Sequence, residues 1–315
     1  MIDNLIQGIK NKDIKSISKA ITLIENNHSS HLELISKLYP LSDNPHRIGI
    51  TGPPGAGKST ITNFLIKHFR KLGHSVAVVL VDPTSPYSNG AVLGDRIRMF
   101  SHYNDDDVFI RSIATRGNKG GLANNMNEIA NIFDAANYDV ILFETVGVGQ
   151  VEIDVVEQVD TVVLVLVPES GDDIQMMKAG VIEIADIFVI NKSDRADANK
   201  LYTSLQNMLN LLIDDNKEMD WIPNIIKTIA TEDRGINDLI KILFKHNKFI
   251  KEKDKVSSSK SKQRYINEVH NILYDKLNTH FWNDKKKDVL SKQINKHSDQ
   301  RISPLKLVEK LITDE

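Results

Sequence analysis

Hydrophobic positions follow two different patterns along the chain. Up to about residue 40 they recur at helical spacing, as at Ile2, Leu5, Ile6 and Ile9. From His46 onward, short β-rich runs, several of them apolar almost throughout, alternate with longer amphipathic segments. The short runs cover residues 47–51, 75–82, 107–114, 138–145, 160–168, 185–194 and 224–230. Strands buried on both faces and separated by helices predict an α/β fold, with a mostly parallel sheet covered by helices on both faces.

Three segments follow from this pattern. Residues 1–43 are predicted to form an N-terminal helical extension, residues 44–250 the α/β domain, and residues 251–315 a C-terminal helical extension. A charged, serine-rich stretch, KEKDKVSSSKSKQ, opens the last segment and is typical of a solvated linker or helix end. No internal repeat is visible.

Composition narrows the possible functions only slightly. The 315 residues carry a net charge of -2, so no broad basic field indicates nucleic-acid binding. There is no cysteine, which excludes disulfides and thiolate metal sites. The N-terminal stretch lacks a long apolar core, so we expect neither a secretory signal nor a membrane segment, and a cytoplasmic location is compatible with these features.

The sequence GPPGAGKST follows the first predicted strand and matches the phosphate-binding P-loop pattern. Its glycines let successive backbone amides point at phosphate oxygens, and the helix that starts near Ser59 adds its positive N-terminal end. Lys58 is expected to reach the β- and γ-phosphates, and the Ser59 hydroxyl to ligate magnesium. The predicted nucleotide-binding residues of this loop are Gly52, Pro54, Gly55, Ala56, Gly57, Lys58, Ser59 and Thr60.

A second motif indicates which base is bound. The sequence NKSD at 191–194 follows another apolar run and resembles the N-K-x-D guanine motif of GTPases. The two oxygens of Asp194 can accept from the ring N–H and the exocyclic amine of guanine, a donor pair that adenine lacks. The Lys192 stem can lie along the base, and Asn191 can tie neighbouring loops together. These residues predict GTP and GDP as ligands.

Further positions at or near strand ends complete the predicted site. Glu144 and Gly147 occupy the place of the D-x-x-G element, where Glu144 would hold magnesium through water and the Gly147 amide would contact the γ-phosphate. Asp82 ends the second strand and is expected to orient the attacking water, while Asp95 would help to hold magnesium. Ala230 is expected to direct its amide at guanine O6. No glutamine or certain arginine finger is evident, so we expect slow intrinsic hydrolysis.

Taken in order, these elements resemble the MeaB/ArgK family, GTPases associated with methylmalonyl-CoA mutase. The resemblance is close over roughly residues 40–245 and looser at the helical ends. It rests on the segments GPPGAGKST, VDPTSPYSNGAVLGDRIRM, TRGNKGGL, FETVGVGQVEIDV and VPESGDDIQMMKAGVIEIADIFVINKSD.

The resemblance implies a P-loop fold of the SIMIBI class and a homodimer to which the terminal helices contribute. It also implies a chaperone that gates cobalamin loading and protects or reactivates the mutase, with no nucleic-acid or membrane partner. By motif, Lys58, Ser59, Asp82, Asp95 and Glu144 carry over as phosphate, magnesium and catalytic residues, and Asn191, Lys192 and Asp194 as guanine readers. Residues 168–178 match a switch that couples the nucleotide to the partner.

Two other functions stay open at this point. One is an ATP- or GTP-dependent kinase or ATPase linked to arginine/ornithine transport, although no protein-kinase feature is visible. The other is a scaffold in which the nucleotide is structural and hydrolysis is negligible. Related nickel-insertion GTPases generally use cysteine- or histidine-rich segments, and this chain offers no cysteine for that role.

Overall fold

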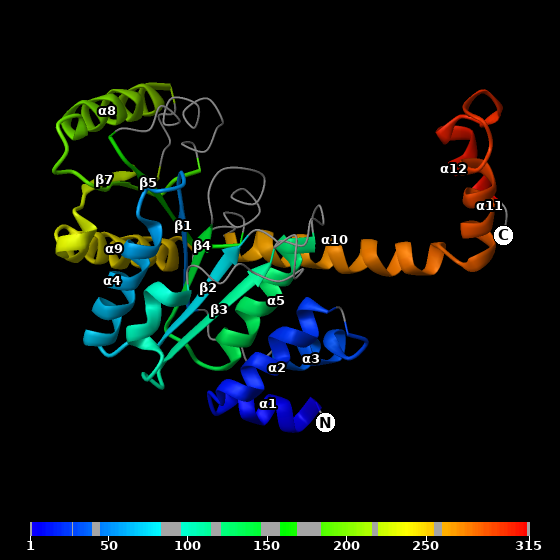
Figure 1. Cartoon of the computed structure of the whole chain (residues 1–315), viewed down its shortest axis with the longest axis horizontal. Coiled ribbons are helices and arrows are strands. Elements are labelled where there is room, and N and C mark those ends of the chain that lie inside the picture. The colour runs from blue at the N-terminus through cyan, green and yellow to red at the C-terminus, as the bar shows by residue number, and fades with distance from the viewer. Residues whose placement is uncertain are drawn as a thin grey trace. The chain divides into compact units, whose positions relative to one another are not determined.

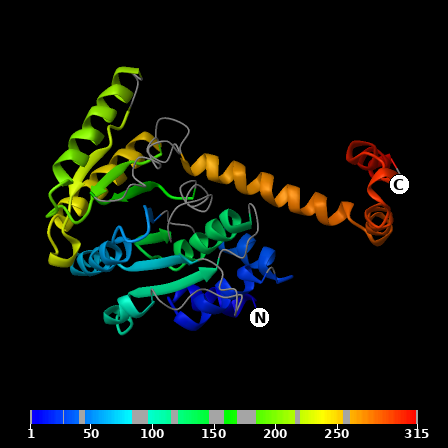
Figure 2. The same cartoon turned by 45° about the horizontal axis from the view of Figure 1, so that its top comes forward.

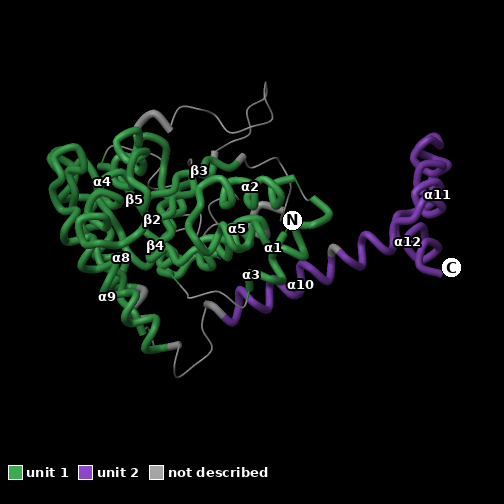
Figure 3. Tube along the Cα trace, turned by 90° about the horizontal axis from the view of Figure 1, so that it is seen from below, with its two compact units in different colours: residues 1–261 green, residues 262–315 purple. Residues whose placement is uncertain are grey.

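The computed structural model describes residues 2–26, 28–39, 45–82, 96–114, 121–145, 158–168, 184–215, 220–254 and 260–313. The chain forms two compact units, Met1–Ser261 and Lys262–Glu315, which are coloured separately in Figure 3. None of the described helices combines the length and the apolar character that crossing a membrane requires.

The first unit begins with three short helices, α1 (Ile2–Lys10), α2 (Ile14–Glu25) and α3 (His31–Leu38). Their apolar residues recur on one face, as the sequence predicted, and that face is buried. Asp13 caps α2, because its carboxylate accepts the backbone N–H of Ser16 at 2.9 Å. The helices lie beside α5 (Gly121–Ala135), as Figures 1 and 2 show.

Seven parallel strands form the central sheet of this unit, in the order β3-β2-β4-β1-β5-β6-β7. All seven predicted strands and their parallel arrangement are confirmed. Their bounds are β1 (His46–Thr51), β2 (Val76–Asp82), β3 (Val108–Ala114), β4 (Val140–Thr145), β5 (Thr161–Leu166), β6 (Ile187–Ile190) and β7 (Asn224–Lys227). Because β1 lies between β4 and β5 and all three are parallel, the C-terminal ends of these strands lie side by side at one edge of the sheet.

Helices cover both faces of the sheet, as the apolar strands required. One face packs on α4 (Lys58–Lys71) and α9 (Ile236–Asp254). The other packs on α5 and the N-terminal helices, and towards β6 and β7 on α8 (Ala198–Asp215). Successive strand residues alternate between these layers, so that Val78 of β2 faces α4 and Val79 faces α5.

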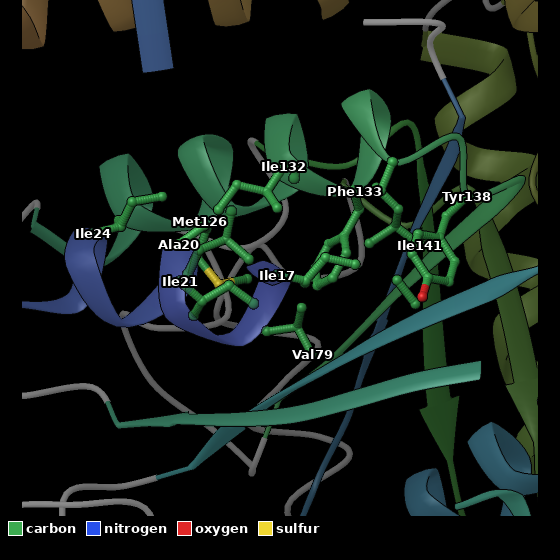
Figure 4. Close-up of a cluster of buried hydrophobic side chains, with 14 of the residues drawn as sticks. Ile17, Ala20, Ile21, Ile24, Val79, Met126, Ile132, Phe133, Tyr138 and Ile141 are labelled. Atoms are coloured by element: carbon green, nitrogen blue, oxygen red, sulfur yellow. The ribbon is translucent and has the colours of Figure 1, made fainter. Parts of the chain in front are cut away.

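The N-terminal helices share one hydrophobic core with the sheet. Figure 4 shows Ile17 and Ile21 of α2 beside Met126 of α5 and Val79 of β2. All four side chains are fully buried. Arg111 of β3 adds a polar contact, since its guanidinium donates to Glu25 of α2 at 2.5 Å. The N-terminal helices are therefore an integral layer of the first unit.

The second unit contains most of α10 (Lys260–Phe281), followed by α11 (Asp284–Ile294) and α12 (Pro304–Thr313). Two short 3-10 helices, η2 (Arg96–His102) and η3 (Ala230–Glu232), belong to the first unit, and a third, η4 (Ser298–Gln300), to the second. Among the described residues of the second unit, only Leu307 and Leu311 are buried hydrophobics. Most of the apolar side chains of α10 are exposed in the single chain.

Candidate functional site

At two positions of the loop between β1 and α4, the backbone and its neighbours leave room for glycine only. Gly52 has φ 144° and Gly57 has φ 92°, both in the region that side chains disfavour. A Cβ atom on Gly52 would overlap the backbone carbonyl of Val165, and one on Gly57 would overlap the side-chain amide of Asn191. The glycines of the motif therefore permit close packing of this loop against two neighbouring segments.

Lys58 is the first residue of α4, and its side chain folds back over the loop. The residue is only 6% exposed, and its Nζ donates to the carbonyl oxygens of Gly52 at 2.7 Å and Pro53 at 3.0 Å. This places a buried ammonium beside the N-terminus of α4, where the helix dipole also favours an anion. The local arrangement suits phosphate binding.

Ser59 and Glu144 meet at the end of the sheet. The Ser59 hydroxyl donates to Glu144 Oε1 at 2.5 Å, and both residues are buried. Strand pairing explains the contact, because Glu144 of β4 lies in register with Ile50, just before the loop. A second hydroxyl bond, from Thr145 to Thr51 at 3.0 Å, joins the same two strands. Hydroxyl and carboxylate oxygens are ligands that Mg²⁺ prefers, so these two residues fit such an ion.

Asn191 connects three loops through its side chain, which confirms that it ties neighbouring loops together. Its Nδ2 donates to the carbonyl of Ala56 in the phosphate loop at 2.8 Å. Its Oδ1 accepts from the Thr228 hydroxyl at 3.0 Å and from the Ala230 N–H at 3.1 Å. Asn191 is buried, so the loss of these bonds would leave polar groups unsatisfied.

The rest of the NKSD motif forms a turn with a more open surface. Lys192 adopts a positive φ of 54°, and the Ser193 N–H donates to the Thr228 carbonyl at 3.1 Å. Asp194 is exposed, which leaves its carboxylate accessible to a ligand. The Ala230 amide donates to Asn191 in this arrangement, and its contact with guanine O6 stays a prediction.

Several predicted residues lie outside the part of the chain that the structure describes. These are Asp95, Gly147 and residues 169–178 of the predicted switch. Asp82 is the last residue of β2, but its side chain is also outside the described part. The roles assigned to these positions stay predictions.

Thr228 and the threonine pair Thr51 and Thr145 are residues of this region that no sequence motif marks. Thr228 lies immediately after β7, and its hydroxyl helps to orient Asn191. Its position in the predicted strand run 224–230 was visible, but a threonine after a strand carries no specific signal by itself. Only the tertiary pairing of β6 with β7 brings it to Asn191.

Comparison with known sequences identifies related proteins over most of the chain. The family model described as methylmalonyl Co-A mutase-associated GTPase MeaB matches residues 17–286. A Pyrococcus horikoshii protein provisionally named a GTPase is 49% identical over 272 residues, covering 86% of each chain. The GTPase ArgK of Escherichia coli is 35% identical over 244 residues, covering 74% of this chain and 72% of its relative.

A mitochondrial mouse protein and a solved structure extend the comparison. The mouse homolog named for methylmalonic aciduria type A is 36% identical over 258 residues, covering 76% of this chain and 61% of its own length. A crystal structure titled LAO/AO transport system kinase superposes with a TM-score of 0.68 and covers 99% of this chain and 96% of its own. Its sequence identity is 23%, so this likeness shows the P-loop α/β fold alone. On the family match and the sequence identities, this chain belongs to the MeaB/ArgK family of GTPases.

Proposed function

We propose that this chain binds GTP with Mg²⁺, hydrolyses it slowly, and uses that cycle as a chaperone of methylmalonyl-CoA mutase. In this role it gates cobalamin loading and protects or reactivates the mutase. The observation that supports the nucleotide part most strongly is the set of hydrogen bonds made by the Asn191 side chain. They join the NKSD turn to the phosphate loop and to the loop that contains Thr228 and Ala230. The mutase part is supported by the family description.

The described residues would bind different parts of the nucleotide and its metal ion. Lys58 and the N-terminus of α4 would bind the phosphates, while Asp194 would accept from guanine. Ser59 and Glu144 would hold Mg²⁺, which when bound would offset the negative charge of the β- and γ-phosphates. The Ser59–Glu144 contact already brings these two groups together, so little rearrangement of the chain is needed.

Four further assignments complete the proposal. Asp82 would orient the attacking water, and Asp95 would help to hold Mg²⁺. The Gly147 amide would contact the γ-phosphate, and the Ala230 amide would exchange its bond to Asn191 for one to guanine O6. Each assignment rests on the position of the residue in the motif and on the family resemblance.

We also propose three segments: a helical extension at 1–43, a GTPase domain at 44–250 and a C-terminal helical extension at 251–315. The C-terminal extension would help to form a homodimer. Along α10 a series of large apolar side chains is 45–69% exposed in the single chain. They are Tyr265, Ile266, Val269, Leu273, Tyr274 and Leu277. Such a continuous apolar face is typical of an interface, because its burial against a second copy removes it from water.

The test is GTP and ATP turnover by the purified protein, with and without a cobalamin-dependent acyl-CoA mutase. We expect GTP-selective turnover that increases when the mutase is added. Asp194→Asn should remove the preference for GTP, because its amide keeps one acceptor oxygen and replaces the other with a donor, which cannot pair with the second guanine N–H. Lys58→Ala and Glu144→Ala should each lower turnover.

The possible outcomes separate this function from its alternatives. Selectivity for GTP without a response to any mutase would retain the GTPase and reject the proposed partner. Equal use of ATP would contradict the role of Asp194 and favour the kinase or ATPase function. Unchanged nucleotide response in both Lys58→Ala and Glu144→Ala would reject the site itself.

A further inference from the structure

The short loop 229–235 is fastened at both of its ends. At its start, Ala230 donates its backbone N–H to the Asn191 side chain. At its far end, the carboxylate of Asp233 contacts His68 Nε2 at 2.6 Å and Lys67 Nζ at 3.4 Å. His68 and Lys67 belong to α4, the helix that begins with Lys58 and Ser59. The loop is therefore attached to the helix that carries the phosphate-binding residues.

Asp233 also has an unusual backbone. Its φ of 57° lies in the left-handed region, which costs free energy for residues other than glycine, although aspartate tolerates it better than most. Its N–H donates to the Ala230 carbonyl at 3.2 Å, so a shift of Asp233 would be passed directly to Ala230. Glycine would relieve the backbone at this position, yet it could not contact His68.

The contact between Asp233 and His68 is partly shielded from water. The side chain of His68 is 12% exposed and that of Asp233 is 28% exposed. Burial by itself raises the pKa of Asp233, but the hydrogen bonds and charges of His68 and Lys67 outweigh it, so the pKa is lowered. The carboxylate is thus held in its charged form by two side chains of α4.

We propose that Asp233 and His68 are positioning residues. They hold loop 229–235, the base-side loop, against α4 and so preorganise the site for a guanine nucleotide. The inference rests on the proposed function, since it assumes that loop 229–235 lies at the base. Neither residue belongs to the motifs that are proposed to contact the nucleotide. Their effect is to fix where Ala230 and Asn191 lie relative to Lys58, which reduces the ordering that binding would otherwise require.

Asp233→Gly tests this directly, because it removes the carboxylate while relieving the backbone. The probes are a fluorescent GDP and inorganic tripolyphosphate, which shares the phosphates but has no base. We expect the affinity for GDP to fall about fivefold or more, while that for tripolyphosphate, measured by competition, changes by less than about twofold. His68→Leu removes the other partner and should have the same selective effect, while His68→Gln, which keeps a donor, should recover part of the affinity.

Asp105→Asn is a matched control. Asp105 binds Arg70 of the same helix at 2.8 Å, but it attaches α4 to the turn at 105–107, away from the base-side loop. This variant should keep wild-type affinity for both probes.

The results distinguish the two proposals. If the wild-type protein prefers guanine nucleotides and Asp233→Gly and His68→Leu bind GDP as it does, the positioning role is wrong and the proposed function stands. Equal losses for GDP and tripolyphosphate would also overturn it, because they would indicate general damage. A wild-type protein without guanine preference would reject both proposals. Should Asp233→Gly fail to fold, His68→Leu decides.

Discussion

At the scale of single residues, the site depends on the absence of a side chain at Gly57. This residue combines a φ of 92° with close contact to the Asn191 carboxamide. In Gly57→Ala the methyl group would push the Asn191 side chain away from the Ala56 carbonyl. The hydrogen bonds by which Asn191 joins the three loops would then be weakened. We expect the affinity for GDP, measured by fluorescence titration, to fall at least about tenfold, equivalent to about 1.4 kcal/mol.

Gly73→Ala is the matched control for that change. Gly73 follows α4 and has a φ of 83°, but no atom lies within 4 Å of an added Cβ. The substitution should therefore cost about 1 kcal/mol of folding free energy through backbone strain, with GDP affinity unchanged. If both variants bind GDP like the wild type, the close packing at Gly57 has no part in binding.

At the scale of elements, one buried arginine joins the first strand to α5. Arg47 of β1 donates to Asp134 at 2.7 Å, to Asn127 at 2.7 Å and to Asn131 at 3.0 Å. Arg47→Met would leave the fully buried Asp134 carboxylate without this guanidinium. We expect the free energy of unfolding, measured in urea, to fall by about 3–5 kcal/mol.

Arg111→Met provides the comparison for Arg47→Met. Arg111 joins β3 to α2 through Glu25, but its side chain is 23% exposed and water can replace part of the contact. We expect its loss to cost no more than about 1 kcal/mol. Equal costs in the two variants would show that burial does not control the strength of these pairs.

A second group of buried, hydrogen-bonded side chains links β1, β5 and α9. The Thr161 hydroxyl lies 2.7 Å from His46 Nε2 and 2.8 Å from His246 Nδ1. Burial lowers the pKa of His46 from 6.5 to about 4, with smaller contributions from nearby charges that include Asp160, which acts in the opposite direction.

Because the folded protein binds this proton more weakly than the unfolded chain, stability should be complete above about pH 6.5 and fall as the pH decreases towards 4. The loss from this group is about 3 kcal/mol in total. Urea unfolding between pH 7 and 4.5 measures it, and His46→Gln, which cannot titrate, should show a shallower decrease with pH. The same pH dependence in both proteins would exclude His46 as the cause.

Elements formed by adjacent residues could be predicted from the sequence, whereas contacts between distant segments could not. The strands were predictable because each is a short apolar run, and the phosphate loop because its residues are adjacent in the chain. The contacts of Asn191 with Ala56 and Thr228, and of His68 with Asp233, depend on which strands become neighbours. Periodicity contains no information about that order, so these partners appear only in the folded chain.

At the scale of the whole molecule, the remaining question is what covers the apolar face of α10. We expect a mass of twice the 35.5 kDa of one chain in sedimentation velocity. Leu273→Asp combined with Leu277→Asp introduces two charges on exposed positions of that face, where they cost the monomer little but would be buried in a dimer. The double variant should sediment as a monomer with unchanged helical content.

Leu72→Asp is the control for this prediction, because Leu72 is similarly exposed at 57% but follows α4 in the first unit. It should leave the mass unchanged. A wild-type monomer at all concentrations would refute the homodimer, and a double variant that stays dimeric would locate the interface elsewhere. A monomeric double variant with intact GTP turnover would show that the first unit carries the nucleotide site independently, since the described residues of that site all lie within Met1–Ser261.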